Sequence, residues 1–141
     1  MIPKYRAWLK QYNVMVDDVS DLTFFEGNLK FIGRRTVGGV SFQYSVEEIE
    51  LMQSTGLKDK NNKEIFEGDI LKVANNDSSW FEVVKYDHNK AMFISKEMNL
   101  KYEVPETPLY DLFSPYLFKV EVIGNIWEDD DLIDGKKANE N

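Results

Sequence analysis

The chain contains no cysteine in its 141 residues, and this absence excludes disulfides, thiol nucleophiles and thiolate metal sites. It contains one histidine, His88, so the usual zinc and His-based hydrolase centres have too few candidate residues. No apolar run approaches the roughly 20 residues of a membrane-spanning helix, and the N-terminal stretch lacks the apolar segment of a signal peptide. We therefore expect a soluble intracellular protein with no membrane partner, in which His88 is a solvated residue of a polar turn.

Negative charge is concentrated near the end of the chain. Residues 128–141 hold six acidic residues and two lysines, a net charge of −4 out of −8 for the whole chain. Hydrophobic residues make up 43% of the composition and aromatic residues 13%, which is typical of a globular domain. We predict a single β-rich domain over residues 1–127, followed by a flexible acidic tail over residues 128–141. The acidic balance also argues against non-specific binding to nucleic acid.

Short apolar or alternating segments separated by turn signals predict a mostly-β fold. We expect about eight short strands that form a curved sheet or pseudo-barrel, with one or two short helices. Residues 22–25 and 29–32 flank a hairpin turn at Gly27 and Asn28, and residues 101–104 form a short edge strand. Residues 46–52 fit either a helix capped by Ser45 or a continuing strand. Thr107 is positioned to cap a short helix. The other expected strands cover residues 5–9, 14–16, 40–46, 69–73, 80–86, 91–95, 117–123 and 125–127, with Gly124 as a bulge or tight bend between the last two.

The segment from residue 53 to residue 73 shows the strongest local pattern. Gly56 suits a backbone position with positive φ, and the Asn61-Asn62 pair tolerates the left-handed region of a turn. Glu67, Gly68 and Asp69 predict a second tight turn that opens a strand. The pattern indicates two turns on either side of a short apolar stretch.

Three stretches of the chain resemble conserved blocks of the YopX family of small phage and prophage proteins. They are KYRAW (residues 4–8), LMQSTGLKDKNNKEIFEGDILKV (residues 51–73, here called the signature segment) and EVIGNIWEDDDLI (residues 121–133), in the family's order. The family carries no established catalytic residues, so the resemblance implies no catalytic, cofactor-binding or metal-binding residue. It implies a protein of the bacterial host's cytoplasm. The residues that carry a structural role by this resemblance are Gly56, Leu57, Asp59, Glu67, Gly68, Asp69, Gly124 and Asn125.

Carboxylates offer the best candidates for an enzyme or metal site. Asp59, Asn61 and Lys63 have the spacing of a calcium loop, but a lysine ligand and Glu64 in place of the required glycine defeat the match. Glu64, Glu67 and Asp69 cluster in sequence and are the residue types that acid–base or magnesium chemistry needs. Bonding of Asp69 and Glu67 to backbone groups of the turn is the interpretation we favour. We expect no cofactor and no enzymatic activity.

The function we expect is binding, either to a second copy of the chain or to a host or phage protein. The alternative is a β-barrel that binds single-stranded nucleic acid, since residues 1–40 hold six basic residues against four acidic ones. Basic residues among aromatic ones track single strands by stacking, although core packing explains most of these aromatic residues more simply. The alternative depends on the basic residues Arg6, Lys10, Lys30, Arg34 and Arg35, together with the aromatic residues Tyr5, Trp8, Phe24, Phe25 and Phe31.

Overall fold

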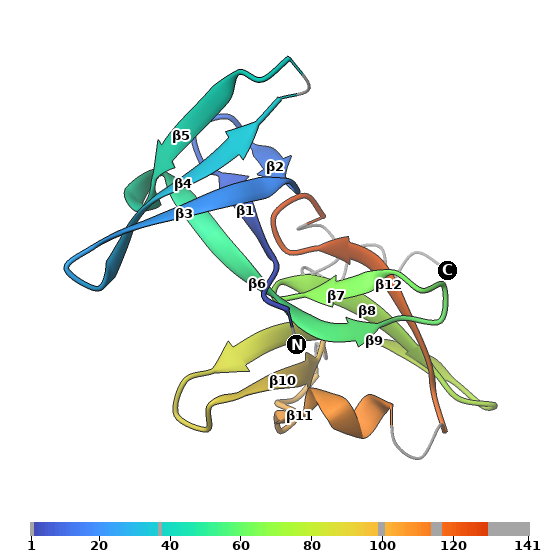
Figure 1. Ribbon diagram of the computed structural model, residues 1–141. Helices are drawn as coiled ribbons and strands as arrows, with labels where there is room; N and C mark the ends of the chain where they lie inside the picture. Colours follow the sequence, from blue (N-terminus) through green and yellow to red (C-terminus); the bar gives the residue numbers. More distant parts are fainter. Residues whose placement is uncertain (1, 37, 99–100, 114–116, 130–141) are drawn as a thin grey trace. The chain divides into compact units, whose positions relative to one another are not determined.

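The computed structural model describes residues 2–36, 38–98, 101–113 and 117–129. The chain divides into two compact units, Met1–Ser54 (unit 1) and Thr55–Asn141 (unit 2). Figure 1 colours the chain by residue number, so the strands of each unit can be followed in it. The boundary falls inside a single strand, β6 (Ile49–Lys58). The region that the sequence predicts as one domain is therefore built from two units.

Unit 1 contains two antiparallel sheets that enclose a small core. Its first sheet has the order β2-β1-β6, and its second has the order β3-β4-β5. Ala7, on the central strand β1, lies opposite both Val16 of β2 and Leu51 of β6, which explains its complete burial. The core is made of Ala7, Leu9, Val16, Ile32 and Ile49. The elements are β1 (Tyr5–Leu9), β2 (Val14–Val16), β3 (Val19–Phe25), β4 (Asn28–Arg35), β5 (Ser41–Ser45), the 3-10 turn η1 (Val46–Glu48) and the first part of β6.

The two turns predicted in unit 1 form with small differences. Glu26 (φ 51°) and Gly27 (φ 82°) are the central residues of the β3–β4 hairpin, so β4 begins at Asn28 and the turn lies one residue earlier than predicted. Ser45 caps the turn as the sequence indicates, but its side chain accepts the backbone N–H of Glu47, at 3.3 Å, and not that of Glu48 as in a capping box. The turn it caps is a single 3-10 turn, and strand β6 follows at once.

Unit 2 contains a five-stranded antiparallel sheet with the order β11-β10-β9-β8-β12, while the last part of β6 pairs with β7. The 3-10 turn η2 buries Leu109 and Leu112. The cap predicted at Thr107 is wrong, because Thr107 lies in strand β11 and the turn begins after Pro108 without a side-chain capping bond. The elements are β7 (Glu64–Phe66), β8 (Asp69–Ala74), β9 (Ser79–Asp87), β10 (Met92–Glu97), β11 (Thr107–Pro108), η2 (Leu109–Leu112) and β12 (Lys119–Asn125). The main core comprises Ile65, Leu71, Val73, Val84, Leu109, Leu112 and Val120.

A buried carboxylate lies within this sheet. Glu82 is only 6% exposed, and both of its oxygens accept hydrogen bonds at 2.7 Å. One bond comes from the indole N–H of Trp80 and the other from the hydroxyl of Ser95. Because a buried polar group without a partner is costly, these two donors make the position tolerable.

The mostly-β prediction is confirmed, including the curved sheet visible in Figure 1. The described residues form twelve strands rather than about eight, and their helical content is limited to 3-10 turns. The edge strand expected at residues 101–104 is wrong, because Thr107 and Pro108 pair with β10 instead. No helix in the described part of the chain is long and apolar enough to cross a membrane.

The folded chain continues into the start of the acidic stretch. Asn125 accepts the backbone N–H groups of Trp127 and Glu128 at 3.0 and 2.9 Å, and its own amide donates to the Glu128 carboxylate at 2.8 Å. Asp129 accepts the Asn125 N–H at 3.1 Å. Gly124 leaves room for this contact, since a Cβ there would approach Asp129 Oδ2 to 2.5 Å. Residues 128 and 129, predicted as tail, therefore belong to the folded structure, while residues 130–141 lie outside the described residues.

Candidate functional site

The carboxylate of Asp59 joins the signature segment to strand β12. Its Oδ1 accepts the backbone N–H groups of Asn61 and Lys63 at 2.9 and 2.8 Å. Its Oδ2 accepts the N–H of Val122, which is 63 residues away in sequence, at 2.9 Å. The N–H of Lys60 donates to Val120 O at 2.9 Å and adds a second link to the same strand. Because β12 is an edge strand, these bonds satisfy backbone groups that its sheet leaves open.

Two opposing effects act on the ionisation of Asp59. Burial favours the neutral acid and raises the pKa of its carboxyl, but the three backbone N–H groups and the charge of Lys63 favour the carboxylate. Together the bonds and the charge outweigh burial, and they lower the pKa below the ordinary value of 3.8. Asp59 is therefore a structural anion.

Gly56 and Leu57 place the last part of β6 against β7. Gly56 has a φ of 80°, as its residue type predicts. The hydroxyl of Thr55 donates to Ile65 O at 2.8 Å and accepts the N–H of Leu57 at 3.1 Å. Leu57 packs against the main core of unit 2. Both residues thus have structural roles.

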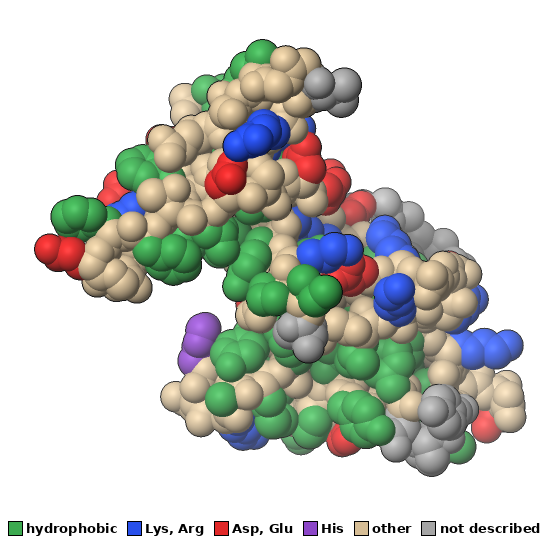
Figure 2. All heavy atoms as spheres, in the orientation of Figure 1, with side chains coloured by type: hydrophobic (Ala, Val, Ile, Leu, Met, Phe, Trp, Pro, Cys, Tyr) green, Lys and Arg blue, Asp and Glu red, His purple; other side chains and the backbone are tan. Residues whose placement is uncertain are grey.

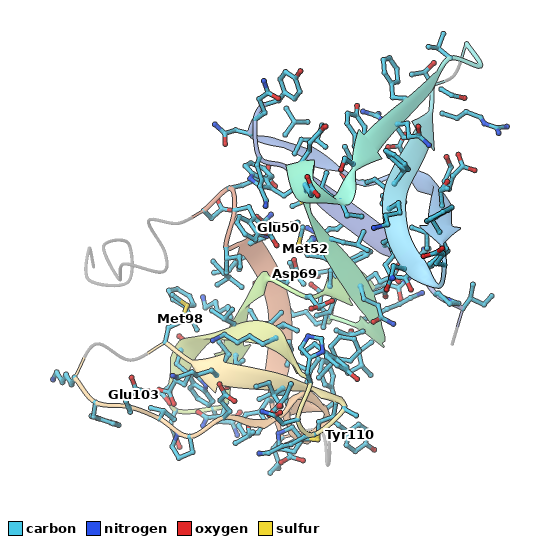
Figure 3. The ribbon with its side chains drawn as sticks, turned by 90° about the vertical axis from the view of Figure 1, so that its left-hand side faces the viewer. Glu50, Met52, Asp69, Met98, Glu103 and Tyr110 are labelled. Carbon is cyan, nitrogen blue, oxygen red and sulfur yellow. The ribbon has the colours of Figure 1, made fainter. Side chains whose placement is uncertain are left out.

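The second turn of the signature segment connects β7 to β8. Gly68 has a φ of 84°, its N–H donates to Val84 O at 2.9 Å, and its C=O accepts the N–H of Ile126 at 2.9 Å. Asp69, labelled in Figure 3 at the start of β8, is 1% exposed and accepts the N–H of Phe66 at 2.8 Å. Within the described ranges, no three His, Asp or Glu residues are placed to share a metal ion.

The basic residues predicted to contact nucleic acid do not form one cationic surface in unit 1. Arg6 is 7% exposed, and its Nε lies 3.4 Å from the sulfur of Met52, which Figure 3 labels. Arg34 pairs with Asp18, at 3.2 Å from Nε to Oδ1 and 3.3 Å from a terminal nitrogen to Oδ2. Lys30 and Arg35 are exposed. Two of the four predicted cations thus have partners within the chain: Arg6 is buried, whereas Arg34 forms a surface ion pair.

The aromatic residues of the same region divide between core and surface. Trp8 is buried, as core packing predicts. Phe24, Phe25 and Phe31 are 58%, 62% and 39% exposed, so core packing is the wrong explanation for them. All three lie on the β3–β4 hairpin, where Phe24 is opposite Leu29 and Phe31 is opposite Thr23. Figure 2 shows hydrophobic side chains on the surface of this part of unit 1.

A hollow of about 580 Å³ lies against the same three-stranded sheet. It forms around Gly33, which has no side chain and lies opposite Asp21 on one side and Gln43 on the other. A Cβ at this position would meet Asp21 Oδ2 at 3.0 Å. The sheet therefore offers a polar depression as well as exposed rings. The lining residues are Ser20, Asp21, Leu22, Thr23, Gly33, Ser41, Phe42 and Gln43.

The structural role of Asp59 predicts a specific response to acid. In Asp59→Asn the amide nitrogen faces a backbone donor, so we expect the free energy of unfolding at pH 7 to fall by about 1–3 kcal/mol. Because the folded pKa is lowered, the stabilisation by Asp59 is present above the unfolded pKa of about 3.9 and is lost as the pH falls through the folded pKa. Urea unfolding between pH 2.5 and pH 7 should show a smaller loss with acid in the variant. The exposed Asp77→Asn is the control, and equal pH dependence of wild type and Asp59→Asn would contradict the assignment.

Substitution of Asp69 distinguishes the hypothesis of a structural turn from that of a metal site. If Asp69 has a structural role, Asp69→Asn should lower the melting temperature, because it removes the charge from the buried side chain that accepts the Phe66 N–H. A metal site predicts the opposite, because carboxylates that repel each other in the empty site are relieved by the substitution. Thermal melts of wild type, Asp69→Asn and Asp77→Asn, with and without magnesium or manganese, decide between them. A stabilised Asp69→Asn together with a metal-responsive wild type would reject the structural assignment.

Comparisons with known proteins place residues 4–134 of the chain in one family. The model of the family described as YopX protein matches residues 4–134. The crystal structure of protein EF1440 from Enterococcus faecalis is 26% identical, with a TM-score of 0.63 over 94% of this chain and 99% of that one. The crystal structure of protein yopX from Bacillus subtilis shares the fold at 20% identity, with a TM-score of 0.61 over 91% and 95% of the two chains. No curated protein matches the sequence. The family resemblance noted in the sequence is thus confirmed, and the chain belongs to the YopX family.

Proposed function

We propose that this protein is a non-enzymatic accessory protein of phages or prophages that binds a host or phage protein. The observation that carries the proposal is the exposure of Phe24, Phe25 and Phe31 on one hairpin. We call these three residues the phenylalanine surface. Phe24 and Phe25 are successive residues of β3, so their side chains point to opposite faces of the hairpin, and the hairpin exposes apolar surface on both faces. Several exposed apolar side chains on one element are typical of interaction sites, whereas single ones are ordinary.

The energetics of the phenylalanine surface favour a protein partner. Complete burial of a phenylalanine side chain stabilises by about 1.5–3 kcal/mol relative to full exposure. Because the three rings are already partly covered, binding of a partner would add only a fraction of this burial free energy for each ring. Three such contributions together are enough for a cluster of hot-spot residues. The neighbouring exposed charges, Glu26 and Lys30, cancel each other. A rim without net charge suits an apolar groove on a protein better than a phosphate backbone.

The signature segment supports a role without catalysis. The carboxylates of Asp59 and Asp69 accept backbone N–H groups, which occupies the oxygens that acid–base or metal chemistry requires. His88 is exposed in a turn. Asp59 and Asp69 therefore support the fold of unit 2.

The alternative function is binding of single-stranded nucleic acid. Its support is the presence of exposed rings with Lys30 and Arg35 on the same sheet, since bases stack on aromatic side chains beside cations. The burial of Arg6 and the pairing of Arg34 with Asp18 weaken it. We therefore rank it second.

A paired substitution tests the proposal. Phe24→Ser together with Phe25→Ser removes two rings of the phenylalanine surface, and Tyr110→Ser, which removes an exposed tyrosine of unit 2, is the control. We expect wild type and Tyr110→Ser to retain one identified protein from host or phage-infected lysate. With that protein purified, calorimetry should show binding at least about tenfold weaker for the double variant. All variants should melt within a few degrees of wild type, since exposed positions contribute little to stability.

Equal binding of the partner by the double variant would reject the phenylalanine surface. The alternative has its own readout, because nucleic-acid binding weakens steeply with added salt. Salt-sensitive binding of a labelled single strand that is lost in Lys30→Ala with Arg35→Ala would favour the nucleic-acid function instead.

A further inference from the structure

Strand β5 is an open sheet edge without the usual protection. It lies at one end of the order β3-β4-β5, and no other strand of the described residues pairs with its outer side. Its sequence, SFQYS, has neither a charge nor a proline, the features that commonly prevent edge strands from pairing. The opposite edge, β3, carries Asp21 and two register irregularities. Features that hinder pairing with another strand are therefore present at the β3 edge of this sheet and absent at the β5 edge.

The register shows which backbone groups of β5 face the open side. The N–H of Thr36 donates to Val40 O at 2.8 Å across the β4–β5 hairpin, which marks a hydrogen-bonded pair. Hydrogen-bonded pairs alternate along an antiparallel ladder, and the β4–β5 register is regular, so Phe42 and Tyr44 bond to β4. The N–H and C=O groups of Ser41 and Gln43 consequently point away from the sheet.

We propose that β5 pairs antiparallel with β5 of a second copy of this chain, about a two-fold axis at Gln43. The two Gln43 residues then exchange both backbone hydrogen bonds, and Ser41 of each copy faces Ser45 of the other. Phe42 of each copy lies opposite Tyr44 of the other in a non-hydrogen-bonded pair, where cross-strand side chains approach most closely. The result is a six-stranded sheet built from two copies of unit 1.

Two properties of the sequence favour a second copy over a foreign strand. SFQYS has the same class of residue at positions equally distant from Gln43, serine with serine and aromatic with aromatic, so it is complementary to its own reverse. The charges at its ends are also complementary. Arg35 lies opposite Ser41 at one end, and the exposed Glu47 follows Ser45 at the other. Antiparallel pairing brings the acidic end of each copy to the basic end of its partner.

The pairing goes beyond the partner binding proposed above, because it uses β5 and not the phenylalanine surface. A contact through one five-residue strand is small, so we expect association that depends on protein concentration. In wild type, sedimentation should show monomers at low concentration and dimers as the concentration rises. Hydrogen exchange at the amides of Ser41 and Gln43 should slow over the same range.

Charge substitutions at the two-fold axis provide the decisive experiment. Gln43→Lys places two lysines opposite each other in the dimer, and Gln43→Glu places two glutamates there, so each variant alone should remain monomeric. An equimolar mixture of Gln43→Lys and Gln43→Glu should restore dimers, which native mass spectrometry identifies as heterodimers by mass. Asn89→Lys, which adds the same charge in an exposed turn of unit 2, should dimerise like wild type.

Three results would overturn the pairing: a monomeric wild type at every concentration, dimers that persist in Gln43→Lys, or a mixture that stays monomeric. None of these results bears on the phenylalanine surface, because loss of partner binding in Phe24→Ser with Phe25→Ser is measured separately. Failure of that partner assay likewise leaves the β5 experiment intact.

Discussion

Unit 2 depends on the carboxylate of Asp59. Edge strand β12 presents backbone groups that its sheet does not pair, and Asp59 accepts one of them, the N–H of Val122, at 2.9 Å. The same carboxylate accepts the N–H groups of Asn61 and Lys63, so it also fixes the turn from which it extends. One anion therefore closes a local turn and also pairs with an open backbone group of β12, where Val122 lies 63 residues later in the sequence. The signature segment is in this sense a structural cover for β12.

The two surfaces for which we propose binding both lie in unit 1. In unit 2, β12 is covered by the signature segment, and the other outer strand, β11, has only two residues. In unit 1, the β3–β4 hairpin exposes three phenylalanine rings, and no strand of the described residues pairs with the outer side of β5. This division is the physical basis for our proposal that unit 1 binds partners and that the signature segment supports the fold.

Local features of this structure were predictable from sequence, and long-range ones were not. The positive φ angles of Gly56 and Gly68 follow from the freedom of glycine, which needs no knowledge of the rest of the chain. The contact of Asp59 with Val122 spans 63 residues, and no local pattern indicates it. Hydrophobicity also misleads at two places. Phenylalanine is usually found in protein cores, yet Phe25 is 62% exposed. Glutamate is usually found at the surface, yet Glu82 is buried and accepts hydrogen bonds from two side chains.

The role of Asp59 is tested most directly by a pH titration followed by nuclear magnetic resonance. The carboxyl carbon of Asp59 and the backbone amide of Val122 should shift together, with a common midpoint below the ordinary carboxyl pKa of 3.8. Joint titration is expected because protonation removes the charge that holds the amide. A carboxyl that titrates at or above its ordinary pKa, or a Val122 amide that does not respond to it, would contradict the account.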